Sequence, residues 1–253
     1  MVTMAELYYF SPTGGTKKAA ELFCAGVAEH TEQIDLCSRG QEPKQPESGL
    51  VVLAAPVYGG RILAIAADKI KRLNGKGKKV VTLAVYGTRA YEDALLELNR
   101  TAEESGFEIL ASAALIARHS IVPAVGEGRP DEADQAEILA FAGKVLEKLG
   151  QGEKNPVKVP GNYPYKPEMA VAATPISLSS CTQCQKCVSA CPSGAIQMGQ
   201  GTTVTSLEAC ILCMACVFAC PEQARVLPPP MQGKMEEKLG VLKTVRRENE
   251  FFL

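Results

Sequence analysis

The residues best suited to chemistry are cysteines, and eight of the ten lie between Cys181 and Cys220. Their spacing, C-x2-C-x2-C-x3-C-P, occurs twice, and each cysteine of the second copy lies 29 residues after its counterpart. The copies comprise Cys181, Cys184, Cys187 and Cys191, and then Cys210, Cys213, Cys216 and Cys220. Zinc sites use separated ligand pairs, and disulfide frameworks belong to short exported chains. Both alternatives therefore explain this duplication poorly.

Three thiolates at this spacing can wrap around one corner of an iron–sulfur cube, each on its own iron, and leave backbone amides directed at its sulfides. The duplicated motif resembles that of bacterial two-cluster ferredoxins, in which the fourth cysteine of each copy binds the other cluster. The resemblance implies two [4Fe–4S] clusters with crossed ligands. One set would be Cys181, Cys184, Cys187 and Cys220, and the other Cys210, Cys213, Cys216 and Cys191. Cys24 and Cys37 fall outside the pattern and are not expected ligands.

A second candidate site follows the first apolar run of the chain. The segment Ser11-Pro12-Thr13-Gly14-Gly15-Thr16 contains three hydroxyl side chains and two glycines, and the expected helix begins directly after it. Backbone amides beside glycines are accessible, and such donors at a helix N-terminus form a site that suits a phosphate group. The spacings of the P-loop and of G-x-G-x-x-G are absent, which disfavours a Walker-type site and a nicotinamide dinucleotide site. Taken alone, the segment could also be an ordinary turn rich in Ser, Thr and Gly.

Two further loops follow later apolar runs, at residues 56–61 and 87–91. Together the three loops resemble those of flavodoxins, in which the first holds the FMN phosphate and the others flank the isoalloxazine ring. The resemblance implies FMN, with Tyr58 and Tyr91 as candidate stacking residues. The implied phosphate contacts are Ser11, Thr13, Gly14, Gly15 and Thr16. The implied ring contacts are Pro56, Val57, Tyr58, Gly59, Gly60, Tyr86, Gly87, Thr88, Arg89 and Tyr91.

Arg89 departs from the flavodoxin pattern, which usually has an acidic residue soon after the fourth strand, and the chain contains no tryptophan. A fixed positive charge beside the flavin would stabilise an anionic reduced ring. The alternative is a solvated surface arginine, and the sequence favours neither.

The first 150 residues alternate apolar runs with helical patterns. Strands are expected at 7–10, 33–36, 50–55, 80–86 and 109–117, and helices at 17–30, 62–73, 91–105 and 131–149. Unbroken apolar runs suit a parallel sheet with helices on both faces. With the resemblance, this indicates an α/β, flavodoxin-like doubly wound sheet of order 2-1-3-4-5 over residues 1–150.

The rest of the chain divides into three parts. Residues 151–178 hold five of the sixteen prolines and are predicted to be an extended linker. Tyr163 and Tyr165 could cover the flavin edge or pack the linker down, and packing is the favoured interpretation. Residues 179–230 are the expected α+β two-cluster ferredoxin domain. In the tail, 231–253, four apolar residues lie at helical spacing, which predicts an amphipathic segment docked on the body: Met235, Leu239, Leu242 and Val245.

The overall charge and hydropathy limit the classes of partner. A net charge of −1 gives no reason to expect nucleic-acid binding. No apolar stretch reaches the roughly 18–20 residues of a membrane helix. The N-terminus also lacks an export pattern, so a cytoplasmic location is predicted.

The two halves together resemble the flavodoxin–ferredoxin fusion proteins of anaerobic bacteria and archaea over nearly the whole chain. The resemblance implies an electron-transfer protein that links two [4Fe–4S] clusters, FMN and a redox partner protein. No side chain is expected to perform acid–base catalysis. The alternatives are an FMN-dependent reductase of a small molecule and a non-redox binding module that has lost FMN. The sequence leaves the partner's identity and the oligomeric state open.

Overall fold

The computed structural model describes residues 1–152 and 155–253. Its N-terminal part contains five strands that pair in parallel. They are β1 (Val2–Tyr9), β2 (Ala28–Asp35), β3 (Leu50–Tyr58), β5 (Lys79–Tyr86) and β6 (Glu108–Ile116). Their spatial order is β2-β1-β3-β5-β6, and the short β4 (Arg61–Ile62) pairs with β3. When the five parallel strands are numbered one to five in chain order, β5 and β6 become the fourth and fifth strands, and the spatial order is 2-1-3-4-5. The predicted flavodoxin-like order is therefore confirmed.

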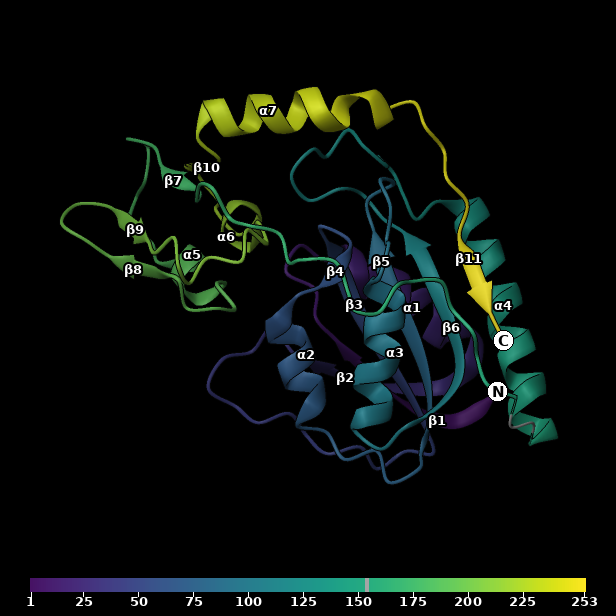
Figure 1. The fold of residues 1–253 in the computed structure, drawn as a ribbon. Coiled ribbons are helices and arrows are strands. Elements are labelled where there is room, and N and C mark those ends of the chain that lie inside the picture. The colour runs from purple at the N-terminus through teal and green to yellow at the C-terminus, as the bar shows by residue number, and fades with distance from the viewer. Residues whose placement is uncertain (153–154) are drawn as a thin grey trace.

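Two pairs of helices cover the sheet, one on each face (Figure 1). α1 (Gly15–Val27) and α4 (Glu132–Gln151) pack on one face, and α2 (Ala64–Lys71) and α3 (Ala94–Glu104) pack on the other. Leu50 and Val52 of β3 point to the first pair, whereas Val51 and Leu53 point to the second. Because both faces are buried, this strand reads as one unbroken apolar run.

The sequence located the helices but misplaced the junction between α1 and β2. The helix expected at 17–30 ends at Val27, and residues 28–30 already belong to β2. β2 is an edge strand whose side chains are mostly polar and exposed. An apolar pattern therefore marks little of it, which is why only 33–36 was expected.

The tail docks on the body as predicted, but it also adds a strand that was not expected. α7 (Pro229–Leu239) and a 3-10 turn (Gly240–Leu242) are followed by β11 (Glu250–Phe252). β11 pairs antiparallel with β6 at the edge of the sheet. Phe251 stacks on Phe141 of α4, with 4.7 Å between ring centroids. Figure 1 shows α7 running from the C-terminal module across to this side of the sheet.

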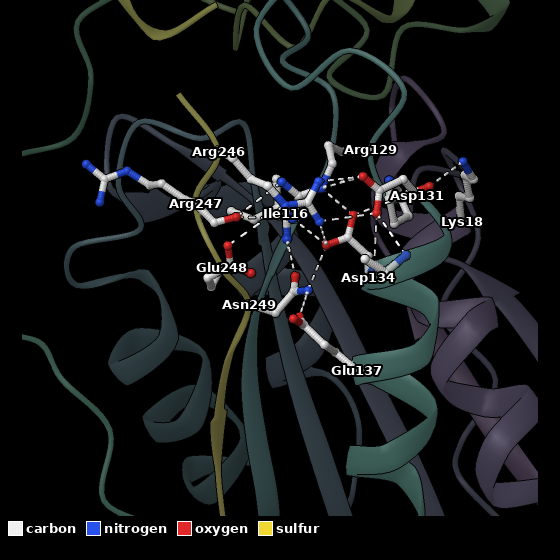
Figure 2. Close-up of polar contacts among 12 residues, drawn as sticks. Lys18, Ile116, Arg129, Asp131, Asp134, Glu137, Arg246, Arg247, Glu248 and Asn249 are labelled. Carbon is white, nitrogen blue, oxygen red and sulfur yellow. Dashed lines mark hydrogen bonds and ion pairs between the residues drawn. The ribbon is translucent and has the colours of Figure 1, made fainter. Parts of the chain in front are cut away.

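A polar network fixes the last residues of the tail (Figure 2). The side-chain carbonyl of Asn249 accepts from the Ile116 amide at 2.9 Å. The side-chain amide of Asn249 donates to Asp134 at 2.9 Å and to Glu137 at 2.7 Å. Asp134 is fully buried and also pairs with Arg129. Asn249 thus links β6 to α4 and holds the tail in place.

The C-terminal module is α+β, as expected. Two small antiparallel sheets join β7 (Ile176–Ser177) to β10 (Arg225–Val226) and β8 (Ile196–Met198) to β9 (Thr203–Thr205). Its helices are α5 (Lys186–Ser189) and α6 (Ala215–Phe218). β7 lies at the end of the segment predicted as a linker. In the described part of the chain, no helix has the length and apolar character needed to span a bilayer.

Candidate functional site

A cavity of about 320 Å³ lies at the carboxyl ends of β1, β3, β5 and β6. Sheets of this order bind their ligands at this edge, and the volume falls in the usual range of small-molecule sites. Ten of the fifteen residues predicted to contact FMN line it: Thr13, Gly15, Thr16, Pro56, Val57, Tyr58, Gly59, Tyr86, Gly87 and Arg89. The described residues that were predicted but do not line it are Ser11, Gly14, Gly60, Thr88 and Tyr91.

The first loop leaves two backbone amides free at the cavity. The Lys17 amide donates to Ser11 Oγ at 2.9 Å, so Ser11 shapes the loop rather than the cavity. Among the described residues, the amides of Gly15 and Thr16 have no acceptor, and both residues line the cavity. They lie at the N-terminus of α1, whose dipole favours an anion. This donor set fits the phosphate of FMN.

The two candidate stacking tyrosines differ in position. Tyr58 lines the cavity, and burial raises the pKa of its hydroxyl, which therefore stays protonated. Tyr91 is 7% exposed and packs edge-on against Tyr86, with 5.3 Å between ring centroids. The Tyr91 hydroxyl donates to Glu250 of the tail strand at 2.7 Å. The structure therefore brings only Tyr58 to the cavity, and Tyr91 contacts β11 instead.

Arg89 lines the cavity, and its guanidinium forms an ion pair with the carboxylate of Glu92. Its guanidinium lies 2.9 Å from Glu92, which also pairs with Lys166 of the linker. The hydrogen bond from Arg89 lowers the pKa of Glu92, so that carboxyl is ionised at neutral pH. An acidic residue is thus present in this loop, three residues after the position where the arginine stands.

Three wall segments were missed by the sequence analysis. They are residues 117–121 after β6, Lys166, Pro167 and Met169 of the linker, and Met235, Lys238 and Leu239 of α7. The first follows a predicted strand at the same sheet edge and could have been found by that signal. The other two reach the cavity only through long-range packing. Tyr163 and Tyr165 pack the linker against Arg100 and Arg61, as expected.

His119, in the first of these segments, faces the cavity as a neutral side chain. Its Nδ1 accepts from the amides of Ile121 and Val122 at 3.1 and 3.2 Å. With Nδ1 as an acceptor, Nε2 carries the ring proton. Burial, with a smaller contribution from the charge of Arg89, lowers the pKa of His119 to about 4. His119 is therefore an uncharged N–H donor at neutral pH.

The eight clustered cysteines separate into two groups of four, each lining its own small cavity. We call Cys191, Cys210, Cys213 and Cys216 the inner set, and Cys181, Cys184, Cys187 and Cys220 the outer set. Each group takes one cysteine from the other copy of the motif, which is the crossed grouping that the resemblance implies. Across residues 1–152 and 155–253, no three His, Cys, Asp or Glu side chains converge to hold a single metal ion. A [4Fe–4S] cluster has a different requirement, because each of its four thiolates binds a different iron.

Both copies of the motif share an unusual backbone. Gln183 and Gln185 have φ of 56° and 62°, and the residues 29 positions later, Leu212 and Met214, have φ of 52° and 66°. Such left-handed conformations are unfavourable for residues other than glycine. Alternating right- and left-handed residues form amide concavities that bind anionic groups. The four thiols and this backbone together fit a [4Fe–4S] cluster in each set.

A family model identifies the C-terminal module. Residues 174–237 match the 4Fe-4S dicluster domain. The matched range begins just before β7 and ends within α7. The module is therefore an iron–sulfur domain, and the chain joins it to a flavodoxin-like sheet.

The chain was also compared with curated proteins and with solved structures. No curated protein matches this sequence. Among solved structures, an archaeal flavodoxin matches at 15% identity and a TM-score of 0.41, over 58% of this chain and 99% of its own. A flavodoxin of Streptococcus pneumonia TIGR4 matches at 17% identity and a TM-score of 0.42, over 58% of this chain and 99% of its own. Flavodoxin 1 of Bacillus cereus matches at 15% identity and a TM-score of 0.42, over 57% of this chain and 98% of its own. The flavodoxin-like fold itself follows from the strand order given above.

Proposed function

We propose that this protein transfers electrons between two [4Fe–4S] clusters and FMN, and on to a redox partner protein. The outer and inner cysteine sets each hold one cluster, and the cavity at the sheet edge holds FMN. When bound, FMN stores one or two electrons and each cluster stores one. The protein's own contribution is to bind these groups, to space them and to set the charges around them.

The observation that carries the proposal is a direct contact between the cavity and the inner set. Tyr58 lines the cavity, and its hydroxyl donates to the carbonyl oxygen of Cys213 at 3.0 Å. One side chain and one peptide group thus connect the two sites. Two cofactors bound for unrelated purposes would not require this contact.

Burial supports an order for the two cysteine sets. In the inner set, Cys191, Cys213 and Cys216 are at most 8% exposed, and Cys213 adjoins the cavity through Tyr58. In the outer set, Cys184 is exposed. The inner set is therefore the one next to FMN, and the outer set is the one that a partner protein reaches from solvent.

The test is a cofactor assay on protein purified without oxygen. About eight irons, a matching amount of acid-labile sulfide and close to one FMN per chain are expected. The matched variants Cys187→Ser and Cys216→Ser remove one ligand from the outer and inner sets, respectively, and each should lower the iron content by about half. A full iron load with no FMN, even after FMN is added, would contradict the proposal. Turnover of a small molecule with an artificial one-electron donor would favour a reductase instead.

A further inference from the structure

Arg225 is a fully buried arginine that has no acidic partner among the described residues. Its side chain is 1% exposed. Nη1 donates to the hydroxyls of Ser177 and Thr203 at 3.0 and 3.1 Å. Nη2 donates to the Pro175 carbonyl oxygen at 2.8 Å and to the Thr205 hydroxyl at 2.6 Å. None of these groups is charged, and Nε–H, also buried, has no partner in the described part of the chain.

The same side chain lies between the two cysteine sets. Nη2 of Arg225 is 3.9 Å from Sγ of Cys216, which belongs to the inner set. Arg225 also lines the small cavity of the outer set, together with Thr203. The position 29 residues earlier in the first copy of the motif is Ile196, so the charge breaks the internal repeat.

A buried cation of this kind needs a negative charge close by. Taking a guanidinium out of water costs free energy that neutral hydroxyls and a carbonyl oxygen do not fully return. A [4Fe–4S] core bound by four thiolates carries a net negative charge, and hydrogen bonds to its sulfur atoms tune its potential. The two cysteine sets are the anionic sites that Arg225 adjoins.

We propose that Arg225 is the shared counter-cation of the two cysteine sets. It donates from Nη2 to Cys216 and keeps its Nε–H for a sulfur atom of a bound cluster. This inference rests on the proposed function, since it requires a cluster in both sets. A fixed positive charge favours the more negative, reduced state, so Arg225 raises both reduction potentials. The effect is larger for the inner set, whose Cys216 it contacts.

The test is a redox titration of the protein with its clusters bound, in which electron paramagnetic resonance monitors the reduction of each cluster. Arg225→Met removes the charge at similar length, and Arg225→Lys keeps the charge. Lys186→Met is the matched control, because Lys186 is an exposed cation beside Cys187. Arg225→Met should lower the one-electron reduction constant of the inner cluster at least tenfold, which corresponds to 59 mV. Arg225→Lys and Lys186→Met should cause smaller shifts. An Arg225→Met protein with full iron and unchanged potentials would overturn the proposal.

A second measurement needs no charge-removing variant, in case Arg225→Met does not assemble its clusters. Wild-type protein is labelled with ¹⁵N in the guanidino groups of arginine, and hyperfine coupling to the reduced clusters is recorded. The labelled Arg225→Lys protein gives the background from other arginines. Coupling present only in the wild type is expected, and its absence would refute the proposed contact. Absence of iron in the wild type would instead refute the proposed function, so the two failures are distinguishable.

Discussion

Replacing Asn249 by alanine should release the C-terminal tail and weaken the FMN site. The Asn249 side chain is 8% exposed and makes three hydrogen bonds, one from Ile116 and two to the carboxylates of Asp134 and Glu137 (Figure 2). α7 lies between this anchor and the iron–sulfur module, and its Met235 and Leu239 form part of the cavity wall. A loosened tail therefore loses part of that wall.

The size of the effect follows from the bonds that are lost. A hydrogen bond contributes about 1 kcal/mol net, somewhat more with a charged partner, and a buried amide left without its acceptor costs about 1–3 kcal/mol. Together these give about 3 kcal/mol for Asn249→Ala. For a chain of this size the thermal midpoint should fall by about 6–12 °C.

Thermal unfolding followed by circular dichroism measures the stability loss, and a fluorescence titration measures FMN affinity. Glu248→Ala is the control, because Glu248 is the neighbouring residue and its side chain is 65% exposed. Its stability should stay within about 0.5 kcal/mol of wild type. If Asn249→Ala unfolded at the same temperature as Glu248→Ala, the tail would not be anchored by Asn249.

Three further predictions concern the cavity. Because the pKa of His119 is lowered to about 4, the folded chain binds fewer protons than the unfolded chain as the pH falls below 6.5. The free energy of unfolding should therefore fall by about 2 kcal/mol between pH 7.5 and pH 5. Urea unfolding at both pH values measures this decrease, and in His119→Gln the part due to His119 should be absent. A Cβ at Gly87 would lie 2.7 Å from His119 Cβ, so Gly87→Ala should lower the free energy of unfolding by about 1–3 kcal/mol and weaken FMN binding in a titration. A Cβ at Gly143 would lie in open space, so the control Gly143→Ala should do neither. Tyr58→Phe should keep its full iron and FMN content but slow electron transfer between them in stopped-flow absorption, because the hydrogen bond to Cys213 is lost.

Much of the fold and part of the site could be predicted because the signals are local. Fully buried strands such as β3 show unbroken apolar runs, and their alternation with helices indicates a parallel sheet. The loops that follow β1, β3 and β5 then have to meet at one edge. The crossed grouping of cysteines was implied by the resemblance to two-cluster ferredoxins, and the four cysteines of each set line a common cavity.

The rest depends on contacts between distant parts of the chain. β11 is a strand of three residues whose pairing with β6 no periodicity reveals. The orientation of Tyr91 is determined by Glu250, which lies 159 residues away in the sequence. Arg225 looks like an ordinary charged residue until the fold buries it between the two cysteine sets. Such features appear only once the packing is known.

The most direct test of electron transfer within one chain is the dependence of its rate on protein concentration. The FMN of anaerobic, fully loaded protein is reduced by a short light flash with a photosensitiser, and the absorption of both cofactor types is then followed. Because Tyr58 joins the cavity to Cys213, a first-order exchange between FMN and the clusters is predicted, with the same rate constant across a wide dilution series. A rate that falls in proportion to protein concentration would show transfer between molecules and would contradict the account.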